Sequence, residues 1–194
     1  MGTQDCQRKE REHLGFAEAV LRHIEPVLAP LGFRRTEQSC YVFMYESAKV
    51  FLQVIHDPMS YAIGIEFWRL AKPSERCTLG GLLASAGEYR SFQASTPDGV
   101  NTAIVEIADL LRRHGRESLT GAPGTYERLV KDIEARSEAY TKEIVQQPIR
   151  TAAHAAWQRG DFAKVRELYE SIDADLTPVE RKRLDYAKSH SSGT

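Results

Sequence analysis

Cysteine is scarce in this sequence, and its three cysteines, Cys6, Cys40 and Cys77, are odd in number and far apart. Small disulfide-bonded secreted domains usually carry an even number of cysteines, and metal sites usually show paired Cys or Cys/His residues at short spacing. Neither pattern occurs, and no two histidines stand three or four residues apart as a helical metal site would require. We therefore expect no disulfide framework and no metal ion.

Long apolar runs are also lacking. No uninterrupted apolar stretch approaches the roughly 20 residues that span a bilayer. The segment Met1–Glu12 is polar and charged, without the apolar region of a secretory signal. We expect a chain that does not enter a membrane and that resides in the cytoplasm.

The sequence has no excess of charge of one sign. Its 26 basic and 27 acidic side chains give a net charge of −1, whereas nucleic-acid-binding proteins usually gather basic residues that neutralise phosphates. Gly80 and Gly81 are not embedded in a phosphate-binding motif such as GxxxxGK[ST] or GxGxxG. We expect no nucleic-acid partner and no cofactor.

The hydrophobic periodicity predicts an α+β fold. Apolar residues recur at helical spacing over 14–31, where Pro26 interrupts the pattern and Gly32 ends it. Aromatic and β-branched residues then alternate as in strands, over the ranges 33–38, 40–46, 49–56 and 61–70. We expect an antiparallel sheet of three to four strands in meander order, with helices on one face.

The rest of the chain is predicted to be helical. The helices expected here cover 78–86, 97–113, 125–147, 149–159, 162–172 and 178–189. Pro148 is expected to end the long helix over 125–147. The turn-forming segment Gly121–Gly124 is the best candidate for a boundary, which predicts an α+β domain over 1–120 and an all-helical region over 125–190.

The strand register predicts which side of the sheet is the core. If Glu46 faces Val50 and His56 faces Tyr61, aliphatic side chains gather on one side. The predicted core residues are Val42, Met44, Val50, Leu52, Val54, Ile63, Ile65 and Phe67.

The opposite side of the sheet would then carry five aromatic residues among small and polar ones. Ala62 and Gly64 predict a shallow groove there, with Gln53 and Glu66 at its floor. Aromatic residues dominate the energetics of protein interfaces, so we expect this face to bind a partner unless the C-terminal helices cover it. The predicted partner-binding residues are Tyr41, Phe43, Tyr45, Phe51, Glu66 and Trp68.

The same register places Cys40 opposite His56, with Asp57 next in sequence. A thiol beside an imidazole is the minimal nucleophilic pair, so a hydrolase or transferase centred on Cys40, His56 and Glu66 is an alternative function. The simpler interpretation is that Cys40 packs as a small hydrophobic residue and that His56-Asp57-Pro58 forms a turn. We expect Cys40 and His56 to be structural.

Two resemblances bear on function. A helix ending in Pro30-Leu31-Gly32-Phe33, followed by antiparallel strands, resembles small bacterial α+β proteins of the toxin-immunity type. The segment 152–187, with Gly160, Phe162 and Leu168-Tyr169, is similar to a single tetratricopeptide hairpin, although Val165 stands at a usually small position. These resemblances imply a non-enzymatic protein-binding protein, an immunity protein or adaptor, whose partner is another protein or a second copy. A single hairpin forms no concave groove, so the peptide-binding role of tetratricopeptide arrays is not carried over.

Overall fold

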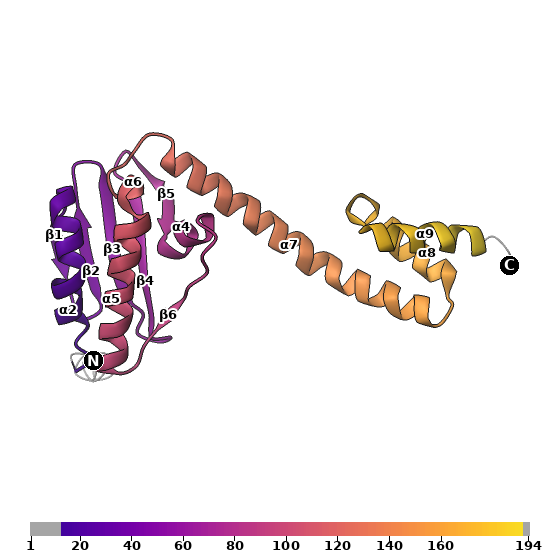
Figure 1. Cartoon of the computed structure of the whole chain (residues 1–194), viewed down its shortest axis with the longest axis horizontal. Coiled ribbons are helices and arrows are strands. Elements are labelled where there is room, and N and C mark those ends of the chain that lie inside the picture. The colour runs from indigo at the N-terminus through magenta and orange to yellow at the C-terminus, as the bar shows by residue number, and fades with distance from the viewer. Residues whose placement is uncertain (1–12, 192–194) are drawn as a thin grey trace, which may run out of the picture. The chain divides into compact units, whose positions relative to one another are not determined.

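The computed structural model describes residues 13–191, and the chain divides into two compact units, Met1–Ile133 and Glu134–Thr194. The first unit contains a sheet with its helices, and the second contains helices alone (Figure 1). In the described part of the chain, no helix is both long enough and apolar enough to cross a membrane.

The sheet is antiparallel, with its first five strands in the order of the sequence. The strands are β1 (Arg34–Gln38), β2 (Val42–Glu46), β3 (Val50–His56), β4 (Ala62–Arg69), β5 (Lys72–Thr78) and β6 (Phe92–Gln93). The short β6 also pairs with β4. The predicted α+β class and antiparallel meander are confirmed, and β5 and β6 extend the predicted sheet. The polar sequence of β5, which contains Pro73, is typical of an edge strand and gives little periodic signal.

The first helical segment is one irregular run. It comprises α2 (Phe16–Ala19), the π-helical turn η1 (Val20–Ile24), α3 (Glu25–Leu28) and the 3-10 turn η2 (Ala29–Leu31). Pro26 has no N–H for a regular helical hydrogen bond, and the wider π turn ends two residues before it, at Ile24. Gly32 ends the run in the left-handed region at φ 81°.

Three more helices follow in the first unit, α4 (Leu79–Ser85), α5 (Pro97–His114) and α6 (Arg116–Leu119). The Thr96 hydroxyl caps α5 by accepting a hydrogen bond from the Gly99 N–H at 3.2 Å. One face of the sheet, the first helical run and α5 share one hydrophobic core, and Figure 1 shows α2 and α5 along the same side of the sheet. The predicted placement of helices on one face is therefore confirmed.

The predicted register of β2 against β3 is wrong by one residue. Phe43 pairs with Val54 and Tyr45 with Leu52, so Phe43 and Tyr45 lie in the core, 0% and 1% exposed. The cause is a tight turn in which Ser47 N–H donates to the Val50 carbonyl at 2.9 Å. A one-residue slip exchanges the faces of a strand. Val42 and Met44 therefore lie on the other side of the sheet.

The predicted core faces of β3 and β4 are correct. All six predicted residues on these strands are buried, namely Val50, Leu52, Val54, Ile63, Ile65 and Phe67. Their pairing differs by two residues from the predicted one, since Val54 lies opposite Ile65. A shift by two keeps every side chain on its own face.

The second unit is built from the later part of α7 (Thr125–Gln158), with α8 (Phe162–Glu170), η3 (Asp173–Asp175) and α9 (Pro178–His190). Its small core consists of Ala153, Ala156, Val165, Tyr169, Ile172, Leu184 and Ala187. The predicted helix end at Pro148 is wrong, because Pro148 lies inside α7. The carbonyl that loses its hydrogen bond to Pro148 belongs to Ile144, which is exposed and can be hydrated.

The division into units falls within α7, after the segment Gly121–Gly124 in which the sequence places the domain boundary. Tyr126 and Leu129, at the start of α7, are buried in the core of the first unit. The Tyr126 hydroxyl also donates to the Ser118 carbonyl at 2.9 Å. The segment Gly121–Gly124 is therefore followed by a helical turn that belongs to the first unit.

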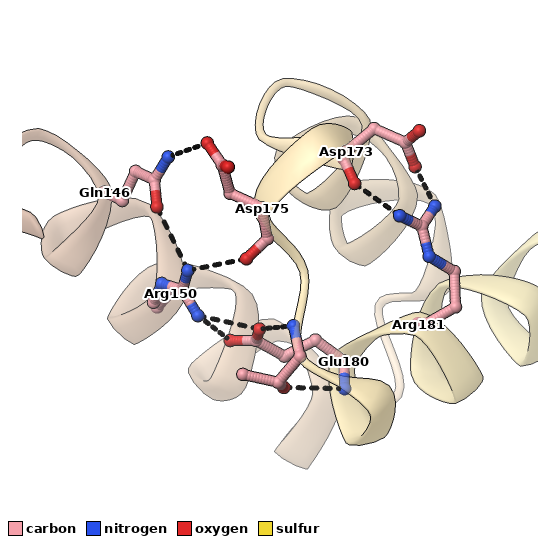
Figure 2. Close-up of polar contacts among 7 residues, drawn as sticks. Gln146, Arg150, Asp173, Asp175, Glu180 and Arg181 are labelled. Atoms are coloured by element: carbon pink, nitrogen blue, oxygen red, sulfur yellow. Dashed lines mark hydrogen bonds and ion pairs between the residues drawn. The ribbon is translucent and has the colours of Figure 1, made fainter. Parts of the chain in front are cut away.

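A polar network joins α7 to α9 within the second unit (Figure 2). The Arg150 guanidinium donates two hydrogen bonds to the Glu180 carboxylate, at 2.7 and 2.9 Å, and one to the Asp175 carbonyl at 2.9 Å. Glu180 also accepts from the Thr177 N–H at 2.7 Å, which completes a capping box at the start of α9. Gln146, which is buried, bonds both Arg150 and Asp175.

Candidate protein-binding face of the sheet

The face of the sheet that points away from the core is the strongest candidate for a functional surface. We call it the open face, and on the three central strands it consists of Val42, Met44, Glu46, Phe51, Gln53, Ile55, Ala62, Gly64, Glu66 and Trp68. Ala62 and Gly64 are exposed, and most of the others are half-buried.

The open face is unusually apolar. An antiparallel sheet with one solvated face normally alternates apolar residues toward the core with polar residues toward water. On the open face of these strands only Glu46, Gln53 and Glu66 are polar, and Glu46 stands at the end of β2. Contiguous apolar surface of this kind is typical of interaction sites.

Trp68 is packed between neighbouring side chains on the open face. Its ring stacks on the cross-strand neighbour Phe51 with 4.5 Å between centroids. The Arg76 guanidinium lies 4.5 Å from the centroid of the indole and 3.6 Å from the Glu66 carboxylate. This packing leaves Trp68 only 9% exposed, so the stack is formed before any partner arrives.

A groove of about 230 Å³ adjoins this stack along β4. It opens where β4 pairs with β5 at Glu66–Arg69 and with β6 at Ala62–Ile63, so the sheet edge is interrupted beside Gly64. A Cβ on Gly64 would meet no atom within 4 Å. The groove is lined by both apolar and polar residues. The apolar ones include Ile55, Ala62 and Phe92, and the polar ones include Glu66, Thr78 and Arg90.

The six predicted partner-binding residues do not all lie on this face. Phe51, Glu66 and Trp68 do, but Phe43 and Tyr45 are in the core and Tyr41 lies on their side of β2. Their predicted placement on the open face is wrong for the reason given above, the two-residue turn at Ser47. The residues that sequence reasoning missed are Val42, Met44 and Arg76. A register with Ser47 opposite Val50 would have indicated the first two.

The three residues of the alternative hydrolase or transferase hypothesis are not brought together. Tyr41, rather than Cys40, lies opposite His56, and the Tyr41 carbonyl accepts from the His56 N–H at 2.8 Å. The imidazole is buried, 3.0 Å from the Ala94 carbonyl and 5.3 Å from the Phe16 ring centroid. Glu66 is on the opposite face of the sheet. The predicted Cys40–His56 pairing is therefore wrong, and the hydrolase or transferase alternative loses its geometric basis.

Within residues 13–191, no group of three or more His, Cys, Asp or Glu side chains could hold a metal ion. Comparisons with protein families, with curated proteins and with solved structures gave no match to this chain.

Proposed function

We propose that this chain is a non-enzymatic protein-binding protein that docks a protein partner on the open face. The observation that carries the proposal is the apolar character of that face around Phe51 and Ile55. Half-buried aliphatic and aromatic side chains gain free energy when a partner removes them from water, at about 25 cal/mol per Å². The Trp68 ring is already stacked on Phe51 in the free protein, which limits the side-chain entropy that binding costs.

The groove beside Gly64 provides a hollow in which a side chain of a partner can be held. An apolar side chain of the partner fits over Ile55 and Ala62, and the rim groups Glu66 and Arg90 provide polar contacts. Such a surface suits a helix or a compact domain of another protein. An immunity protein that binds a toxin, or an adaptor, is the biological role that agrees with the resemblance of the helix–sheet layout.

Site-specific photocrosslinking in cells tests this proposal. A photoreactive amino acid at Gln53, in the middle of the open face, should give a discrete crosslinked protein, whereas one at the exposed Asn101 on α5 should not. Gly64→Trp, whose Cβ would meet no atom within 4 Å, should block the groove, abolish the crosslink and leave the free energy of unfolding nearly unchanged.

Two outcomes would contradict the proposal. One is equal crosslinking from Gln53 and Asn101, and the other is a Gln53 crosslink that Gly64→Trp leaves intact. If the crosslinked protein is toxic to cells when expressed alone, co-expression of this chain should restore growth, and the Gly64→Trp variant should not.

A further inference from the structure

The middle of α7 is largely exposed to solvent. From residue 134 to 145 every side chain is exposed except Arg136, which is half-buried. A helix of about 12 residues is marginally stable in water unless one face packs against something. This stretch lies entirely in the second unit, and it is separate from the open face.

Three large apolar side chains lie on one side of this stretch. Tyr140, Ile144 and Val145 are 68%, 53% and 61% exposed. At 100° per residue they fall on one side of the helix. Gln146 and Ala153, which are buried in the second unit, fall on the other side. The β-branched pair Ile144-Val145 has low intrinsic helix propensity, so its place in α7 favours a role in packing.

We propose that this side of α7 pairs in antiparallel orientation with the same segment of a second copy of the chain. The argument is charge complementarity. Arg136 and Glu143 are seven residues apart, so they lie on the same edge of the apolar stripe, and Tyr140 lies between them in sequence.

An antiparallel copy reverses the order of these charges. Arg136 then meets Glu143 of the partner subunit, and Glu143 meets Arg136 of the partner subunit, with the two-fold axis beside Tyr140. In a parallel pair, residues of the same number lie level and these two ion pairs do not form. The interface is isologous, as expected for a homodimer.

The pairing should be weak. Twelve helical residues extend about 18 Å, and two such segments bury less surface than the roughly 1,600 Å² of a standard interface. We therefore expect a dimer that forms as the protein concentration rises, with rim ion pairs that set its orientation.

Sedimentation equilibrium of the full chain over a range of concentrations tests the proposal. The average mass should rise from 21.9 kDa toward twice that value. Ile144→Glu should give a monomer at every concentration. Arg136→Glu and Glu143→Arg should each weaken the dimer about tenfold by placing like charges together, and the double exchange should restore it.

The matched control is Lys182→Glu, a charge reversal at an exposed position of α9, which should leave the dimer unchanged. Circular dichroism establishes that each variant keeps its helix content. A monomer at all concentrations would overturn the proposal, as would a dimer that survives Ile144→Glu. The proposal would also be overturned if the double exchange of Arg136 and Glu143 did not restore the dimer that each single exchange weakens.

Discussion

Phe51 and Trp68 stack across β3 and β4 with 4.5 Å between their ring centroids. The Arg76 guanidinium, from the neighbouring strand β5, lies over the indole at 4.5 Å from its centroid. Aromatic pairs and cation–π contacts of this kind each contribute about 0.5–1.5 kcal/mol beyond the burial of area. The open face is thus an ordered surface in the free protein, which is the condition for binding without a large entropic cost.

Removal of the Arg76 side chain should expose the indole of Trp68. In a Trp157→Phe background, which leaves Trp68 as the single tryptophan, Arg76→Ala should shift the fluorescence emission maximum to longer wavelength and increase acrylamide quenching. Lys72→Ala on the same strand is the control, because Lys72 pairs with Glu75 at 3.0 Å. An unchanged spectrum in Arg76→Ala would contradict the stacking geometry.

Leu52→Ala should cost about 2–5 kcal/mol of unfolding free energy, because it deletes a fully buried side chain at the centre of the sheet. Its neighbour Gln53 points to the open face, so Gln53→Ala should change the stability by less than about 0.5 kcal/mol. Urea denaturation followed by circular dichroism compares the two variants. Equal losses would show that the two faces of β3 are not distinguished as described.

The contrast between β3 and β2 shows what the sequence could predict. On β3 the aliphatic residues Val50, Leu52 and Val54 alternate with Phe51, Gln53 and Ile55, and the polar Gln53 in the middle of the strand marks the face that is not the core. On β2 both faces are apolar, Val42 and Met44 on one and Phe43 and Tyr45 on the other. The alternation of residues therefore does not show which face of β2 lies in the core.

The turn between β2 and β3 determines which side of β2 faces the core. Ser47 bonds to Val50 through both its backbone and its side chain, and sequence patterns alone do not specify that two-residue loop. The groove beside Ala62 and Gly64 was predictable because small residues between large ones leave a hollow, although Gln53 does not line it. The course of α7 through Pro148 was not predictable, since contacts on both sides of the proline hold the helix.

Arg150→Ala should destabilise the second unit by on the order of 3 kcal/mol. The substitution leaves the Glu180 carboxylate, which is 13% exposed, without its bidentate partner and leaves the Asp175 carbonyl without a donor. Arg166→Ala is the control, because Arg166 pairs with Glu170 on the surface of α8 and such pairs contribute about 0.3–0.5 kcal/mol. Amide hydrogen exchange in α9 reports the local effect, and equal protection in the two variants would contradict the role of Arg150.

The same network should make the second unit sensitive to acid. Hydrogen bonds from Lys142 and Gln146 lower the pKa of Asp175 below its ordinary value of 3.8. For Glu180 burial acts to raise the pKa, but hydrogen bonds from Thr177 and the charge of Arg150 outweigh it, and the pKa falls below the ordinary value of 4.5. A carboxylate with a lowered pKa in the folded state stabilises that state above its unfolded pKa.

This stabilisation should be lost as the pH falls from about 4.5 through the lowered values, because the unfolded chain then binds more protons than the folded one. The double variant Asp175→Asn with Glu180→Gln should therefore be less stable at neutral pH and should show a flatter loss of stability below about pH 4.5. Lys142→Met, which removes the cation beside Asp175, should flatten the acid limb in part. Urea denaturation at several pH values, with exchange in α9 as the readout, measures the slopes. An acid limb of wild-type steepness in the double variant would show that these two carboxylates do not govern the acid stability of the unit.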